Sequence, residues 1–155
     1  YILALNTTLL NVQYITNRSN RIWGLVPRPA NRSAKHYGKE KDMDDITNEK
    51  IKEYSFLKDM YQDDYFPDFL VDKGKEILIT LCKKIEKKKP GSVNKLYKLT
   101  HSATIKFNKL NEEFYAHDSE TETAARECIA EDFEYISLAY GFEADIEKLI
   151  QNRDW

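Results

Sequence analysis

Two long stretches of the sequence repeat their inward-facing residues every three or four positions, and a helix-breaking Pro90-Gly91 pair separates them. The first stretch, Asp68 to about Lys88, has the apolar positions Leu70, Ile77, Leu78, Leu81 and Ile85. The second, Val93 to about Tyr115, has Val93, Leu96, Tyr97, Thr100, Ala103, Thr104, Phe107, Leu110 and Phe114 on one face. This spacing is typical of amphipathic helices. The pattern therefore predicts an antiparallel pair of long helices, with Ser92 as the N-cap of the second.

Gly74 falls in the middle of the apolar face of the first stretch. Glycine destabilises a helix interior by about 1 kcal/mol relative to alanine, so its presence there needs a packing reason. We expect a neighbouring helix or the preceding aromatic connector, residues 61–67, to approach the backbone closely at Gly74.

Three further helices are expected around this pair. Asn48 to about Met60 is expected to be a short helix with the apolar residues Ile51, Tyr54, Phe56 and Leu57. Another short helix is expected from Ala144 to Gln151. Ser119-Glu120-Thr121-Glu122 matches the S-x-x-E capping box, which predicts a helix from Glu120 to Tyr140 that ends at a left-handed Gly141. No segment reads convincingly as a strand. The sequence predicts an all-α fold, a small antiparallel bundle of about five helices preceded by an irregular N-terminal extension.

The N-terminal part of the chain differs from the rest in charge. Residues 1–42 contain seven Lys/Arg and two Asp/Glu, whereas residues 43–155 contain seventeen and twenty-four. The codons of Lys39-Glu40-Lys41-Asp42-Met43 can form a purine-rich ribosome-binding run before a start codon. We therefore expect Met43 to be the natural initiator, residues 1–42 to be a non-native extension, and residues 43–155 to be a single helical domain. A native but disordered extension is the alternative.

Composition argues against several classes of function. The mean hydropathy of −0.67 and the 32% of charged residues indicate a soluble chain with no membrane segment. The net acidity of residues 43–155 argues against nucleic-acid binding, for which Lys83 to Lys98 is the only candidate surface. Within it, Lys83-Lys84 and Lys87-Lys88-Lys89 are better explained as charges that complement the carbonyl groups at the end of a helix.

The two cysteines, Cys82 and Cys128, have no C-x-x-C spacing, and each lies on the apolar side of an expected helix. We interpret them as small buried side chains in a reducing compartment, and we expect a cytoplasmic location. A disulfide or a metal pair is the alternative.

Several short segments spread over residues 43–155 together resemble a known family. They are Asn48-Glu49-Lys50, Lys58-Asp59-Met60-Tyr61, Tyr65-Phe66-Pro67, Leu70-Val71-Asp72-Lys73-Gly74-Lys75, Leu99-Thr100-His101, Ala125-Arg126-Glu127, Ile129-Ala130-Glu131-Asp132-Phe133, Ala139-Tyr140-Gly141-Phe142 and Arg153-Asp154-Trp155. This set resembles a family of small bacterial proteins, domain-of-unknown-function family 5713. The likeness covers residues 43–155 and none of residues 1–42, and it implies no activity, substrate or cofactor.

One carboxylate falls on the apolar side of the helix expected from Glu120 to Tyr140. At about 100° per residue, Asp132 lies within the apolar stripe, and it needs a cation or several hydrogen-bond donors there. Arg153, His101 and a tyrosine hydroxyl are the candidate partners. The favoured interpretation is a structural network. The alternative is an enzyme with a small site in which His101 acts as acid or base beside Asp132 and Tyr97.

Glu127, Glu131 and Glu134 fall on the opposite side of the same helix and form an acidic ridge. The ridge is either solubilising or a docking surface for a basic partner. No HxxxH pair, ExxH pair or phosphate-binding loop occurs, so neither a metal nor a cofactor is predicted. The favoured function is a small protein-interaction or regulatory module whose partner is another protein, and the sequence does not specify an oligomeric state.

Overall fold

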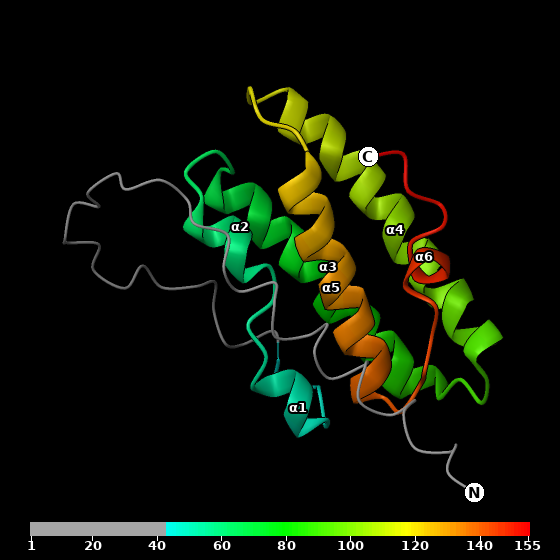
Figure 1. Cartoon of the computed structure of the whole chain (residues 1–155). Coiled ribbons are helices and arrows are strands. Elements are labelled where there is room, and N and C mark those ends of the chain that lie inside the picture. Colours follow the sequence, from blue (N-terminus) through cyan, green and yellow to red (C-terminus); the bar gives the residue numbers. More distant parts are fainter. Residues whose placement is uncertain (1–42) are drawn as a thin grey trace, which may run out of the picture. The chain divides into compact units, whose positions relative to one another are not determined.

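The structure, a computed structural model, describes residues 43–155, so the prediction for residues 1–42 lies outside the described residues. Six helices follow one another: α1 (Glu49–Lys52), α2 (Lys58–Gln62), α3 (Asp68–Lys88), α4 (Val93–Tyr115), α5 (Thr123–Ala139) and α6 (Ile146–Leu149). No strand occurs among the described residues, and the all-α prediction is confirmed. The three long helices α3, α4 and α5 run side by side, with α6 and the C-terminal tail along α4 (Figure 1).

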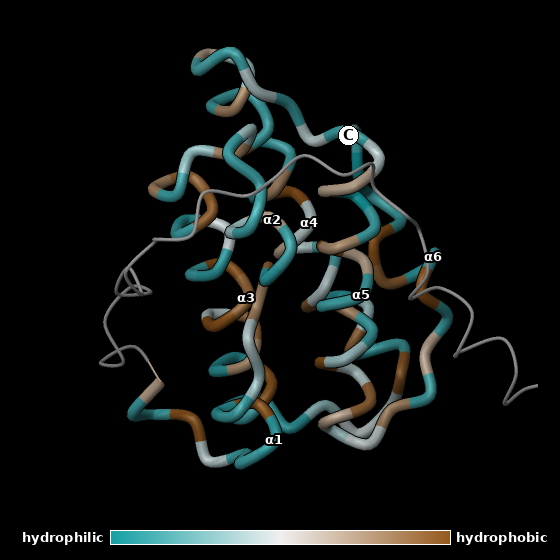
Figure 2. Tube along the Cα trace, turned by 60° about the vertical axis from the view of Figure 1, so that its left-hand side comes forward, coloured by the Kyte–Doolittle hydropathy of each residue, from teal (hydrophilic) through white to brown (hydrophobic). Residues whose placement is uncertain are grey.

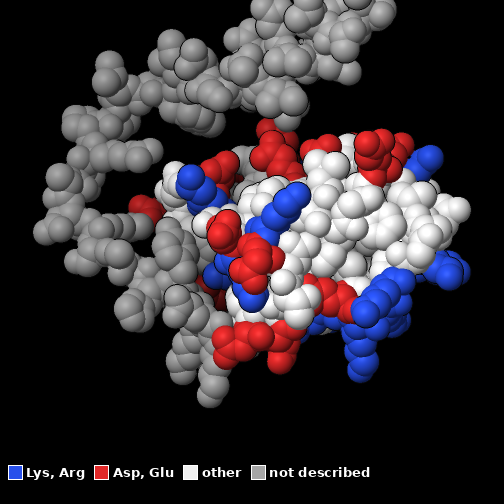
Figure 3. Space-filling model, turned by 90° about the horizontal axis from the view of Figure 1, so that it is seen from below, with Lys and Arg blue, Asp and Glu red and all other residues white. Residues whose placement is uncertain are grey.

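The pair α3 and α4 has the bounds that the periodicity predicts. Ser92 is the N-cap of α4, since its hydroxyl accepts a hydrogen bond from the backbone N–H of Lys95 at 3.4 Å. At the other side of the turn, Lys89 ends α3 with a left-handed φ of 44°. Lysine side chains gather at this end of the bundle (Figure 3), where they complement the exposed carbonyl groups of α3.

The hydrophobic core lies between the long helices, whose apolar residues alternate with hydrophilic ones along each trace (Figure 2). Gly74 is buried in this core, as predicted. A Cβ atom at Gly74 would lie 2.8 Å from Cδ1 of Leu57 and 3.3 Å from Cε1 of Phe107. The neighbouring helix α4 therefore approaches the backbone of α3 at this point, as predicted, and the other close contact comes from Leu57 before α2 instead of from the aromatic connector.

The prediction of one helix from Asn48 to about Met60 is wrong. The chain forms the single turn α1, leaves the helical conformation over residues 53–57, and starts again as α2. Leu57 has a left-handed φ of 53°, which is uncommon for a residue with a Cβ atom. Its backbone N–H donates to Asp132 instead of to a carbonyl group one turn earlier. This long-range acceptor competes with the local helical hydrogen bond and interrupts the helix.

The capping-box prediction is also wrong, because α5 begins at Thr123 with no side-chain hydrogen bond at its N-cap. Ser119 is buried, and its N–H donates to the carbonyl of Phe114 to complete the end of α4. The N–H of Thr121 donates to the side chain of Asn111. These contacts with α4 keep the segment out of the helix. At the other end, the predicted left-handed Gly141 is confirmed, with a φ of 80°.

The C-terminal tail closes one side of the core. Here α6 is shorter than the predicted helix from Ala144 to Gln151. Leu149, Ile150 and Trp155 are buried, and the indole ring of Trp155 packs edge-on against Phe107. None of the helices within residues 43–155 is both long and apolar enough to cross a membrane. Both cysteines are free and buried.

Candidate functional site

Asp132 on α5 is the most buried carboxylate of the described residues, with 3% of its surface exposed. Its Oδ1 accepts a hydrogen bond from the hydroxyl of Tyr54 at 2.8 Å, and its Oδ2 accepts one from the backbone N–H of Leu57 at 2.8 Å. Of the three partners predicted for Asp132, the tyrosine hydroxyl is therefore the one that the structure shows. Arg153 instead pairs with Glu147, at 2.9 Å.

The hydrogen bond to Asp132 and the backbone conformation of Leu57 belong together. A left-handed residue with a Cβ atom costs about 1–2 kcal/mol, so it persists only where other contacts stabilise it. Leu57 is 1% exposed and packs its side chain near Gly74, while its N–H reaches Asp132. The buried carboxylate thus holds the break between α1 and α2 in place.

A pocket of about 500 Å³ opens between residues 53–59, called the broken segment below, and α5. Its lining residues are Glu53, Tyr54, Ser55, Lys58, Asp59, Cys128, Glu131, Asp132 and Tyr135. The rings of Tyr54 and Tyr135 are stacked, with centroids 3.7 Å apart and planes 12° from parallel. The hydroxyl of Tyr135 donates to the carbonyl of Lys50 at 3.1 Å, which ties α1 to α5 at one side of the pocket.

The electrostatics of the pocket follow from burial. Desolvation raises the pKa of Asp132 to about 7, although the hydrogen bonds from Tyr54 and Leu57 oppose this rise. Burial first and the charge of Asp132 second raise the pKa of the Tyr54 hydroxyl. The same two causes raise the pKa of the Cys128 thiol to about 12. Because a nucleophilic cysteine reacts as its thiolate, this thiol is unsuited to nucleophilic attack at neutral pH.

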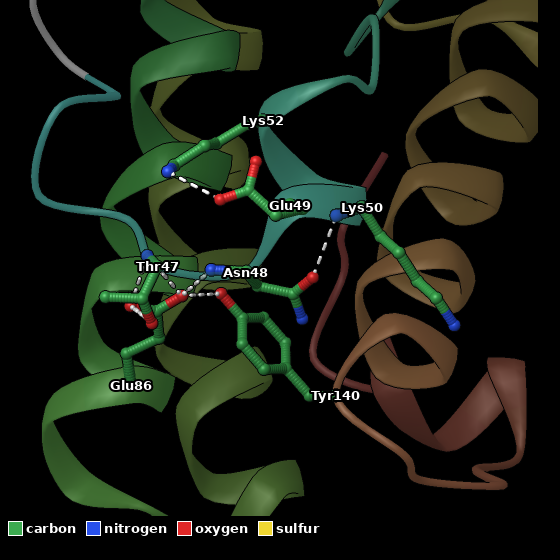
Figure 4. A network of polar contacts seen from close by, with 7 residues as sticks. All are labelled: Thr47, Asn48, Glu49, Lys50, Lys52, Glu86 and Tyr140. Atoms are coloured by element: carbon green, nitrogen blue, oxygen red, sulfur yellow. Dashed lines mark hydrogen bonds and ion pairs between the residues drawn. The ribbon is translucent and has the colours of Figure 1, made fainter.

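A second carboxylate, Glu86 on α3, anchors the segment that leads into α1 (Figure 4). It accepts hydrogen bonds from the backbone N–H groups of Thr47 and Asn48, from the Thr47 hydroxyl, and from the hydroxyl of Tyr140 at 2.9 Å. Desolvation acts to raise the pKa of Glu86, but the hydrogen bonds from Thr47, Asn48 and Tyr140 outweigh it, and the pKa is lowered. The network therefore has a structural role: it holds the segment before α1 against α3.

The predicted catalytic candidates lie in two separate environments. The Nε2 atom of His101 is 2.7 Å from the carbonyl oxygen of Lys148, and its ring is stacked with that of Tyr97. The hydroxyl of Tyr97 accepts a hydrogen bond from the N–H of Asp145 at 3.1 Å. His101 and Tyr97 thus hold the α6 segment against α4, whereas the hydrogen bonds of Asp132 come from Tyr54 and Leu57. No hydrogen bond within residues 43–155 joins His101 to Asp132.

The predicted acidic ridge is exposed along α5. Glu131 belongs both to the ridge and to the rim of the pocket, and Glu127 and Glu134 lie beside it at helical spacings of four and three residues. Glu53 and Asp59, from the broken segment, add exposed carboxylates at the pocket. These five residues, Glu53, Asp59, Glu127, Glu131 and Glu134, are called the acidic face below.

Sequence reasoning missed the roles of Tyr54 and Leu57. The sequence pattern placed both among apolar helix positions, and no local signal marks the left-handed residue. The sequence showed that Asp132 needs hydrogen-bond donors. It did not show which tyrosine would donate, because the position of Tyr54 depends on the interruption of the helix.

The chain matches one family model over residues 50–155, that of a family of unknown function (DUF5713). No curated protein and no solved structure matches the chain. Within residues 43–155, no group of three or more His, Cys, Asp or Glu side chains is arranged to hold a metal ion.

Proposed function

The chain belongs to the DUF5713 family of unknown function, and we propose that it is a protein-interaction module. Its acidic face binds a basic segment of another protein. We also propose that it is a cytoplasmic bacterial protein, since two free, buried cysteines suit a reducing compartment and the resemblance is to small bacterial proteins.

The observation that supports this proposal is that two separate elements place exposed carboxylates around the same pocket. Glu53 and Asp59 come from the broken segment, and Glu131 comes from α5. Among the residues that the structure describes, Lys58 is the single cationic side chain that lines the pocket. Glu127 and Glu134 extend the negative charge along α5 beyond the rim.

Such a surface favours a cationic partner for two reasons. Negative groups that line a concave surface reinforce one another's potential, which speeds the encounter with a positive segment. The same groups repel an acidic partner, so they contribute specificity more than affinity. The enzymatic alternative around His101, Tyr97 and Asp132 has weaker support, because these side chains are engaged by different elements.

The proposal is tested with a lysine-rich and a glutamate-rich peptide of equal length, titrated against the protein by fluorescence anisotropy. We expect only the lysine-rich peptide to bind. The double variant Glu127→Lys/Glu134→Lys should weaken that binding about tenfold.

The control is Glu76→Lys/Glu112→Lys, which changes the net charge equally at exposed sites on α3 and α4. Its binding should stay within about twofold of the unmodified protein. Equal weakening in both variants would mean that net charge alone attracts the peptide, and the proposed docking face would then be wrong.

A further inference from the structure

We infer that the pocket beside Asp132 binds an alkylammonium group, with the Asp132 carboxylate as its counter-ion and the Tyr54–Tyr135 pair as its aromatic wall. The inference deepens the proposed function, and it rests on that function only for the source of the cation, a lysine side chain of the partner.

The first step is that Asp132 has no counter-ion in the part of the chain that the structure describes. Both of its hydrogen bonds come from neutral donors, the Tyr54 hydroxyl and the Leu57 N–H. The ion pairs of residues 43–155 join other carboxylates to Lys and Arg, and Lys58, which lines the same pocket, makes none with Asp132. A buried carboxylate is normally paired with a cation. Here the neighbouring space is a pocket, and Lys58, the basic residue of its described lining, makes no ion pair with Asp132.

The second step concerns what the pocket offers to an organic cation. Its volume of about 500 Å³ lies within the range of roughly 300–1,000 Å³ that small-molecule sites occupy. The rings of Tyr54 and Tyr135 both line it, and each covers one face of the other. A cation within about 6 Å of such a ring is attracted to its face, so the pair would attract a cation through an outer face. Asp59 and Glu131 add negative charge at the rim.

The third step selects ammonium over guanidinium. A guanidinium group binds a carboxylate best through two parallel hydrogen bonds, one to each oxygen. Both oxygens of Asp132 already accept a hydrogen bond from the protein, and the residue is 3% exposed. An ammonium group needs only one point of contact, so it suits this carboxylate better.

The test uses n-butylammonium chloride, which mimics a lysine side chain, titrated into the isotope-labelled full chain and followed by NMR. We expect saturable amide shifts centred on Tyr54, Leu57, Cys128 and Asp132, with a midpoint on the order of 1–10 mM. The bound cation should also lower the pKa of the Asp132 carboxyl group, since an opposite charge favours the ionised form. The neutral n-butanol should produce neither effect, and n-butylguanidinium should bind several-fold more weakly.

Two outcomes would overturn the inference. One is that n-butanol shifts the same residues to the same extent, which would show an apolar site. The other is that n-butylammonium leaves the pKa of Asp132 unchanged.

Variants add a second readout. Asp132→Asn removes the charge and should abolish the saturable shifts. If that variant does not fold, Asp59→Asn/Glu131→Gln serves instead, since both residues are exposed rim carboxylates. This double variant should weaken the binding of n-butylammonium several-fold, whereas Glu76→Gln/Glu112→Gln should leave the binding unchanged. Unchanged affinity in the rim variant would contradict the inference.

The peptide titration separates this inference from the proposed function. Binding of the lysine-rich peptide without any response of the pocket to n-butylammonium leaves the docking face standing and overturns the pocket. A pocket that binds n-butylammonium, in a protein that binds no peptide, supports the ammonium site and overturns the docking function. The cation would then come from a free amine.

Discussion

At the scale of single residues, Asp132 sets the conformation of a segment 75 positions earlier in the chain. Its carboxylate accepts the N–H of a left-handed Leu57 and the hydroxyl of Tyr54. Removing the acceptor leaves a buried donor unsatisfied, which costs about 1–3 kcal/mol for each group.

We therefore predict that Asp132→Ala lowers the free energy of unfolding by roughly 2–4 kcal/mol at pH 5, where its carboxyl group is mostly neutral. Glu131→Ala, on the exposed side of the same helix, should change it by less than about 0.5 kcal/mol. Urea denaturation of both variants measures the difference. Equal effects would show that the hydrogen bonds to Asp132 do not stabilise the fold.

Gly74 gives a second prediction at this scale. Alanine should gain about 1 kcal/mol of helix propensity, but its Cβ would meet Leu57 at 2.8 Å and Phe107 at 3.3 Å. Both side chains are buried in the core and have little room to move. We expect Gly74→Ala to destabilise the protein by about 1–2 kcal/mol in a urea titration.

Gly91 is the matched control, since nothing lies within 4 Å of an added Cβ there. Gly91→Ala should leave stability unchanged or raise it slightly. A Gly74→Ala protein more stable than its parent would rule out the close approach.

At the scale of elements, the agreement between sequence and structure depends on where each helix finds its hydrogen-bond partners. The long helices α3 and α4 were predictable because their periodicity and their ends are encoded locally. The break between α1 and α2 was not, because the acceptor that causes it lies on α5. The capping box failed for a similar reason, since Asn111 and the end of α4 bind the residues that would have formed it.

The same reasoning applies to the candidate site. The exposed ridge on α5 and the burial of Asp132 followed from helical spacing alone. The pocket did not, because one of its walls is the interrupted helix.

The end of α3 yields a third prediction. Lys89 is exposed and has a left-handed φ of 44°, a conformation that costs a residue with a Cβ atom about 1–2 kcal/mol. Lys89→Gly should therefore raise the free energy of unfolding by about 0.5–1 kcal/mol. Lys88→Gly, one position earlier within the helix, should lower it by a similar amount. Thermal or urea unfolding would contradict this explanation if both variants were destabilised equally.

At the scale of the whole molecule, the core of residues 43–155 is closed by α6 and by the buried Trp155. We predict that a chain starting at Met43 unfolds within about 2 °C of the full chain, which corresponds to well under 1 kcal/mol. Differential scanning calorimetry of both chains measures this. A loss of several degrees would show that residues 1–42 stabilise the domain.

The pH dependence of folding follows from the same buried carboxylate. Asp132 has a pKa of about 7 in the folded protein, against about 3.9 in an unfolded chain. The folded state therefore holds one more proton between about pH 4 and pH 7. The stability that this group contributes is complete below about pH 4, and it is lost as the pH rises toward 7. Asp132→Ala should remove this slope.

The most direct test of Asp132 as a buried carboxylate without a counter-ion is a titration of its side-chain carboxyl carbon by NMR in the free protein. We expect the carboxyl group to titrate near the raised pKa of about 7. A pKa near the ordinary aspartate value of about 3.9 would mean that water or a cation already compensates the charge. The interpretation of the pocket as an ammonium site would then be contradicted.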